Sequence, residues 1–171
     1  MAESTRHHLQ ELLTSFDTAM FITRYGEGEH ARPMAVAGVE GVNTLWFATS
    51  LNAPKADEIR RDSRVSATFQ SERHFVALSG RAELVTDRAK INELWKPTWK
   101  VWFPNGKDDP ALALIRVSVL DAEFWDNAGA KGIRYAFEAA KALFTKQTPP
   151  EVEGLHGRVK TRDGEPVSQR H

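Results

Sequence analysis

The stretch that decides the fold runs from Arg32 to Lys55 and reads RPMAVAGVEGVNTLWFATSLNAPK. Apolar residues alternate with other residues on both sides of residues 40–43, which have the composition of a tight turn. A helix start follows, because Pro54 suits the first helical turn. The stretch therefore predicts two antiparallel strands, over residues 31–39 and 44–49, that lead into a helix.

Two hydroxyl groups and a lysine gather where the second of these strands meets the helix. Thr49 and Ser50 end the strand, and Lys55 follows in the first helical turn. A helix N-terminus carries partial positive charge and unpaired N–H donors, so it favours a phosphate. Arg32, on the neighbouring strand, could reach the same anion with its planar guanidinium. Taken singly, the hydroxyls could be helix caps and the two cations surface charges, but the combination favours phosphate binding.

The rest of the chain adds strands and few helices. Residues 19–24, 64–70, 74–85 and 112–125 have strand patterns, whereas residues 4–16, 88–95 and 132–144 have helical ones. Asp87 is a predicted helix cap, and Gly80 indicates a bulge within its strand. Short hairpin connections favour an antiparallel sheet, and closure removes exposed edges. We therefore expect a mainly β fold, a six-stranded antiparallel split β-barrel with peripheral helices.

Composition excludes several classes of protein. The 171 residues contain 23 basic and 23 acidic side chains, so no overall charge favours nucleic acid as a partner. There is no cysteine for disulfides or thiol chemistry, and no apolar run of membrane-spanning length. We expect one cytoplasmic domain over residues 1–147. A polar, loosely ordered tail is expected over residues 148–171.

Five short segments, taken together and in order, resemble the flavin-binding split-barrel superfamily that includes pyridoxamine 5'-phosphate oxidase. The closest resemblance is to its bacterial general stress protein branch. The segments are RPM at 32–34, LWFATS at 45–50 with Lys55 beyond it, LSGRAE at 78–83, WFPNGKDDP at 102–110 and EFWD at 123–126.

The resemblance implies that FMN, or FAD, is the cofactor, and that the chain is a homodimer with both flavins at the subunit interface. Arg32 and Lys55 would then bind the flavin phosphate, with Thr49 and Ser50 as further donors. Pro33, Met34 and the backbone of Phe47 and Ala48 would lie along the isoalloxazine ring, and Trp125 would approach the flavin of the partner subunit.

The resemblance stops at one segment. In the oxidases an Arg-Leu-His-Asp-Arg segment that grips the substrate follows the Glu-Phe-Trp strand, whereas here residues 129–134 read GAKGIR. We therefore do not expect pyridoxamine 5'-phosphate oxidase activity. Two functions stay open: a flavin-dependent oxidoreductase for an unknown small molecule, and a non-catalytic stress protein that binds, stores or senses flavin. A related barrel that binds haem or a deazaflavin is a third alternative.

No catalytic residue is assigned from the sequence, and the six histidines lack the spacing of metal ligands. Trp95, Trp99 and Trp102 recur at helical spacing, which predicts a core or interface stripe. Trp102 and Phe103 could also form a wall of the flavin pocket.

Overall fold

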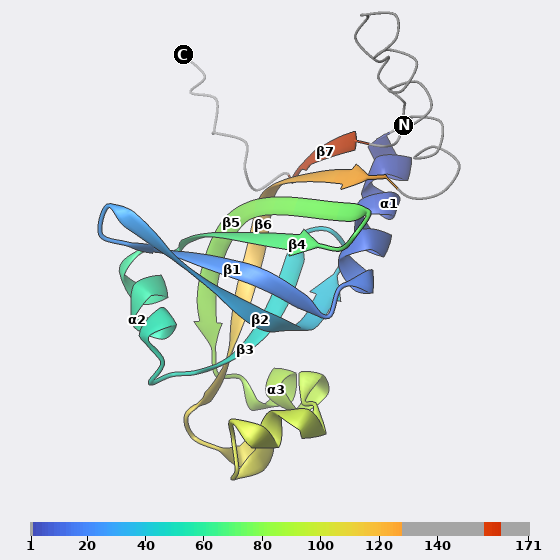
Figure 1. Cartoon of the computed structure of the whole chain (residues 1–171). Coiled ribbons are helices and arrows are strands. Elements are labelled where there is room, and N and C mark those ends of the chain that lie inside the picture. Colours follow the sequence, from blue (N-terminus) through green and yellow to red (C-terminus); the bar gives the residue numbers. More distant parts are fainter. Residues whose placement is uncertain (1, 128–155, 162–171) are drawn as a thin grey trace, which may run out of the picture.

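A computed structural model of the chain describes residues 2–127 and 156–161 (Figure 1). Its helices are α1 (Ala2–Ser15), α2 (Pro54–Arg61) and α3 (Arg88–Leu94), with the short 3-10 helices η1 (Pro97–Val101) and η2 (Gly106–Asp108). Its strands are β1 (Thr18–Tyr25), β2 (Gly28–Glu40), β3 (Thr44–Ser50), β4 (Arg64–Gln70), β5 (His74–Val85), β6 (Leu112–Asp126) and β7 (His156–Lys160).

Six strands form a closed antiparallel barrel. The sheet order is β3-β2-β1-β4-β5-β6-β7, and a further pairing of β3 with β6 joins the first strand to the sixth. The expected six-stranded split barrel is therefore confirmed. The predicted bounds of β4 and β5 are those of the structure. Leu9 and Leu13 of α1 belong to the same core cluster as Phe21, Phe47 and Phe69 of the barrel.

The last strand was not predicted. The second half of β6 pairs with β5 on one side and with β7 on the other, from Asp121 opposite Lys160 to Trp125 opposite His156. The expectation that residues 148–171 are loosely ordered is thus wrong for residues 156–160. The reason is non-local, because the five residues are held by pairing with a strand that lies far away in the sequence. Arg158 also forms an ion pair with Asp121.

A second apolar cluster lies outside the barrel and fixes the segment between β5 and β6. It includes Trp46 of β3, Ile91 of α3, Trp99 of η1, and Phe103. Asp87 caps α3 as predicted, because its carboxylate accepts a hydrogen bond from the N–H of Ala89 at 3.0 Å. Figure 1 shows α3 and the two short helices at one end of the barrel, beside the β2–β3 sheet region.

One expectation for this segment needs correction. The three tryptophans do not form one stripe, and residues 106–108 after them form η2. Helix α3 ends at Leu94 and η1 begins at Pro97, so the helical spacing is broken between Trp95 and Trp99. The helix predicted over residues 132–144, and the GAKGIR segment, lie outside the described residues. Of the helices described, none is long and apolar enough to cross a membrane.

The predicted bulge at Gly80 is confirmed, and it generates a prediction. The β5–β6 register shifts between Ser79 and Gly80. A Cβ atom at Gly80 would lie 2.3 Å from the carbonyl oxygen of Ser118, which is backbone that cannot yield freely. We expect Gly80→Ala to lower the free energy of unfolding by about 2 kcal/mol. Thermal denaturation measures this loss, with Ser79→Ala on the exposed neighbour as the control. Equal melting temperatures for the two variants would contradict the assignment.

Candidate functional site

The barrel opens where β2 and β3 stop pairing. Their ladder runs from Glu40 opposite Thr44 to Val36 opposite Phe47, with a register shift near Ala37. Before Val36, β2 pairs only with β1, and beyond Phe47, β3 pairs only with β6. The two strands therefore diverge, and each turns one backbone edge toward the gap.

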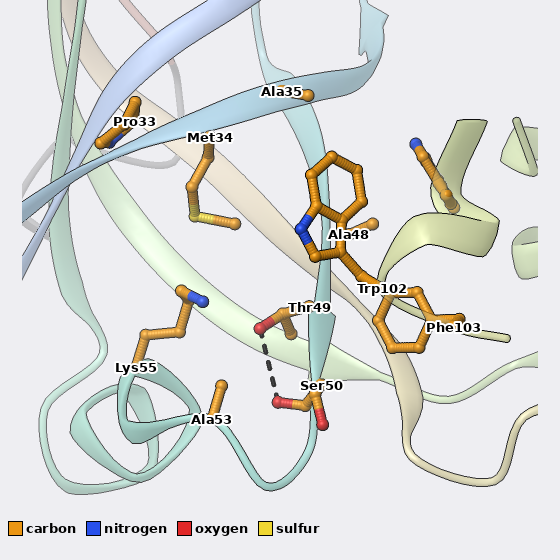
Figure 2. A pocket seen from close by; sticks show the side chains of 11 residues that line it. Pro33, Met34, Ala35, Ala48, Thr49, Ser50, Ala53, Lys55, Trp102 and Phe103 are labelled. Carbon is orange, nitrogen blue, oxygen red and sulfur yellow. Dashed lines mark hydrogen bonds between the residues drawn. The ribbon is translucent and has the colours of Figure 1, made fainter.

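A pocket of about 390 Å³ occupies this gap (Figure 2). This volume falls within the range of small-molecule sites. The lining residues come from β2, from the end of β3, from the start of α2 and from η1 with the residues that follow it. They are Pro33, Met34, Ala35, Ala48, Thr49, Ser50, Ala53, Lys55, Trp99, Trp102 and Phe103. The structure thus gathers six of the nine residues predicted for the cofactor: Pro33, Met34, Ala48, Thr49, Ser50 and Lys55.

Lys55 is the only charged side chain among the lining residues. Within residues 2–127 and 156–161 its ammonium group has no hydrogen bond or ion pair. Burial and the nearby positive charge of Arg32 lower the pKa of Lys55, while the charge of Glu58 opposes this shift. Figure 2 shows the side chain reaching from α2 toward Thr49 and Met34. A partly buried cation next to another cation is unfavourable unless an anion joins them.

Arg32 does not line the pocket, because its guanidinium is directed toward Glu58 of α2 and Thr23 of β1. It donates to the carboxylate of Glu58 at 2.8 Å and to the hydroxyl of Thr23 at 2.5 Å. Glu58 is only 5% exposed and also contacts His30 Nδ1 at 2.7 Å. Burial alone would raise the pKa of Glu58, but the contacts with Thr23, His30 and Arg32 lower it on balance.

This network of Arg32, Thr23, His30 and Glu58 was not predicted from the sequence. Glu58 lies on the buried face of α2, together with Ala56 and Ile59. A glutamate next to an isoleucine in a short charged helix reads as a surface residue, so the sequence carried no clear signal. The buried Thr23 in β1 was equally unmarked. Its strand position faces the interior, and only the fold shows which carboxylate it meets.

The hydroxyl groups of Thr49 and Ser50 do not cap α2. The helix begins after Ala53, which makes no side-chain capping bond. Thr49 donates to the Ser50 carbonyl at 3.4 Å, and the Ser50 hydroxyl accepts from the N–H of Asn52 at 3.2 Å. The N–H groups of Ala53 and Ala56 are bonded inside this turn. Free helical N–H donors are therefore fewer than the sequence suggested, and the Lys55 side chain is the main cationic donor.

Aromatic residues after α3 form the opposite wall. Trp99 and Phe103 belong to the second apolar cluster, whereas Trp102 between them lines the pocket with much of its side chain exposed. Lys96 precedes η1 and donates to the carbonyl oxygen of Val36 at 2.9 Å, at the last residue of the β2–β3 ladder. This hydrogen bond ties the aromatic segment to the mouth of the gap.

Two further predicted residues lie away from the pocket. The side chain of Phe47 is fully buried in the barrel, with its ring centroid 5.1 Å from that of Phe21, so only its backbone borders the gap. Trp125 lies near the far end of β6 and stacks on His156, with 5.3 Å between ring centroids. In the described part of the chain, no three side chains lie together as metal ligands.

Comparison with known proteins gives the family and the fold. The family model described as pyridoxamine 5'-phosphate oxidase like matches residues 4–150. Among characterised proteins, the chain is 29% identical over 129 residues to protein bli-3 of Neurospora crassa, which covers 68% of this chain and 62% of that protein. The chain thus spans less than two thirds of the length of that relative.

Solved structures agree in fold. A structure described as general stress protein 26, from a Jannaschia species, superposes with a TM-score of 0.72 at 25% identity, over 94% of this chain and all of that one. The general stress FMN/FAD-binding protein of Xanthomonas citri has a TM-score of 0.65 at 31% identity, over 75% of this chain and 92% of that one. With the family model spanning most of its length, the chain belongs to the pyridoxamine 5'-phosphate oxidase-like family.

Proposed function

We propose that the chain binds FMN, or FAD, in the pocket between β2 and β3. The observation that carries this proposal is the partly buried Lys55, which has no hydrogen-bond or ion-pair partner among the described residues, in a pocket whose other walls are largely apolar. That combination suits a flat ring that ends in a phosphate. The similarity to the general stress FMN/FAD-binding protein of Xanthomonas citri supports the same ligand class.

The phosphate end lies at the start of α2. Lys55 supplies a point charge, and the hydroxyls of Thr49 and Ser50 supply short-range polar contacts. Arg32 does not line the pocket and uses two of its five N–H donors on Thr23 and Glu58, so it would act on the phosphate mainly through its nearby positive charge. Because a flavin phosphate is close to dianionic at neutral pH, it would relieve the repulsion between the two cations.

The ring end lies between the strands and the aromatic segment. Met34 from β2 and Ala48 from β3 offer apolar contact on one side, next to Pro33 and the backbone of Phe47. The unpaired edge of β3 beyond Phe47 offers backbone groups to the polar edge of the ring. When bound, the flavin supplies the redox chemistry, and these residues would hold and orient it.

A homodimer would complete the site. Met20 on β1 is 42% exposed between buried neighbours, so it points outward from the barrel, and Trp125 is exposed on the same sheet. Phe75 on β5 lies directly opposite Trp125. These outward apolar side chains suit a partner surface, and we propose that Trp125 reaches the flavin of a second copy across it.

We propose flavin-dependent oxidation or reduction of a small molecule as the activity. A second candidate, flavin binding without turnover, is favoured by the lining residues themselves. They include no carboxylate, histidine or tyrosine that could act as an acid or base, although hydride transfer to a flavin does not require one. Reduction of the bound flavin by NADH or NADPH separates the two candidates.

The phosphate assignment is tested with two ligands that differ only in the phosphate. Replacing Lys55 with methionine should weaken FMN binding by roughly 10- to 150-fold, because one charge-assisted hydrogen bond is lost. Riboflavin affinity should stay the same, since riboflavin lacks the phosphate. Quenching of flavin or protein fluorescence during titration measures both affinities.

The matched control for this variant is Arg60→Gln, which removes one positive charge from an exposed position on the same helix. It should leave the ratio of FMN to riboflavin affinity close to that of the parent. If Lys55→Met leaves the ratio unchanged, the phosphate lies elsewhere, and if the parent binds neither flavin, the proposed function is wrong.

The two cations should have opposite effects on the stability of the ligand-free protein. The pKa of Lys55 is lowered on folding, so the unfolded chain holds that proton more tightly, and the charged lysine opposes folding at neutral pH. Lys55→Met should therefore raise the melting temperature. Arg32→Gln should lower stability by about 2 kcal/mol, because it removes a partner of the buried Glu58.

The pH dependence checks the sign of the Lys55 effect. The free energy of unfolding of the parent should increase as pH rises from the lowered pKa of Lys55 toward the ordinary lysine value. Over the same pH range, the difference in unfolding free energy between Lys55→Met and the parent should shrink. Chemical denaturation from neutral to alkaline pH measures this difference. A deficit that stays constant, or a destabilised Lys55→Met protein, would contradict the argument.

The dimer is tested by light scattering at micromolar concentration, where the parent should have twice the mass of one chain. Met20→Arg should give monomers, because it places a charge in the proposed apolar interface. Thr14→Arg, on the exposed face of α1, is the control and should stay dimeric. A parent that scatters as a monomer would rule out this interface.

A further inference from the structure

Trp102 is an exposed tryptophan on a rigid support. Its side chain is 67% exposed, and that of the preceding Val101 is 79% exposed. The backbone beneath it is fixed, because the N–H groups of Trp102 and Phe103 both donate to the carbonyl of Trp99 at 2.9 Å. Trp99 is in turn buried in the second apolar cluster. Tryptophan is enriched at binding interfaces, because its large ring system gains contact area there while its N–H can find a partner.

The indole of Trp102 has no ring contact and no hydrogen bond with the rest of the described chain. This separates it from its neighbours, since Trp95 and Trp99 make an edge contact with 5.6 Å between their ring centroids. Trp102 is nevertheless one of the lining residues of the pocket. Its free ring surface is thus available to whatever fills the pocket.

The residues that line the pocket beside Trp102 include small and flexible apolar side chains. Figure 2 shows Met34 and Lys55 on the left, the indole of Trp102 near the centre beside Ala48, and Phe103 to the right, with Thr49 of β3 between Lys55 and Phe103. The walls consist of the indole, a flexible thioether and a small methyl group. They leave a slot with one aromatic face, which suits a planar heterocycle stacked on that face.

We propose that Trp102 stacks on one face of the bound isoalloxazine ring and thereby decides which electron donors reach the flavin. This inference rests on the proposed flavin site and assigns a specificity-determining role within it. The β2–β3 side chains cover the other face of the ring. A planar hydride donor must approach a ring face to within about 3–3.5 Å, so Trp102 has to move before such a donor can react.

The consequence is a flavin that planar donors reduce slowly. In the reaction with a dihydronicotinamide, the donor loses a hydride and becomes the oxidised nicotinamide, while the flavin gains that hydride and is reduced. Removing the indole opens the face on which the nicotinamide ring stacks. Trp102 therefore selects against planar two-electron donors and leaves the edge of the flavin to smaller ones.

The test uses the full chain loaded with FMN, as the parent, Trp102→Phe, Trp102→Ala and the control Val101→Ala. The first readout is the fluorescence of bound FMN, because a stacked indole donates an electron to the excited flavin and quenches it. We expect strong quenching in the parent and the control, less in Trp102→Phe, and a bright bound flavin in Trp102→Ala.

The second readout is the anaerobic bleaching rate with NADH and with NADPH. Trp102→Ala should be bleached at least about tenfold faster than the parent, whereas Val101→Ala should match the parent. The third readout is affinity. Loss of the stacking contact should weaken FMN and riboflavin by the same factor of about ten, unlike loss of Lys55, which affects FMN alone.

The outcomes separate this inference from the function on which it rests. A parent that binds neither FMN nor riboflavin overturns both. If Trp102→Ala binds FMN tightly, and its flavin fluorescence and bleaching rates equal those of the parent, the stacking role is wrong and the flavin site stands. The quenching would then come from another tryptophan, such as Trp99. If the flavin bound to Trp102→Ala is fluorescent but is bleached no faster than in the parent, Trp102 stacks on the ring and does not select electron donors.

Discussion

The whole arrangement depends on the end of the β2–β3 ladder at Val36 and Phe47. Each of these strands keeps its other neighbour, β1 or β6, so the barrel stays closed elsewhere while this one seam opens. Backbone N–H and C=O groups left without partners where the two strands separate would destabilise the fold. Val36 resolves part of this by donating its N–H to the Asp17 carbonyl and accepting from Lys96. The same opening gives the protein a largely apolar recess, between α2 on one side and η1 on the other.

The two cations near α2, Arg32 and Lys55, have different surroundings and different roles. Arg32 is held by Glu58 and Thr23 and so ties the helix to the β1–β2 hairpin. Lys55 lies one turn before Glu58 on α2, and within the part of the chain that the structure describes it has no such partner. Its charge is retained in a partly buried position next to another positive group, which is an arrangement that packing alone would not favour. Residues that oppose folding in this way are a recognised feature of ligand sites.

Local signals in the sequence were sufficient for most of the architecture. Alternating residues such as Val65, Ala67 and Phe69 identified β4, and Pro54 and Gly80 marked a helix start and a bulge. The features that were missed all depend on distant partners. The sequence of β7 has one large apolar residue, Val159, and becomes a strand only beside β6. The partnership of Arg32 with Glu58, and the different surroundings of Trp99 and Trp102, appear only once the chain has folded.

The last strand has a consequence for how the protein behaves among other copies of itself. The outer half of β6 would otherwise present a row of free N–H and C=O groups to solvent from Asp121 to Trp125. Such an edge is a template for intermolecular sheet growth, and β7 covers it, with charged Arg158 and Lys160 pointing outward. A chain shortened before His156 would leave this stretch of β6 without its partner strand, beside the partly exposed Trp125, and so open to pairing with the edge of another chain.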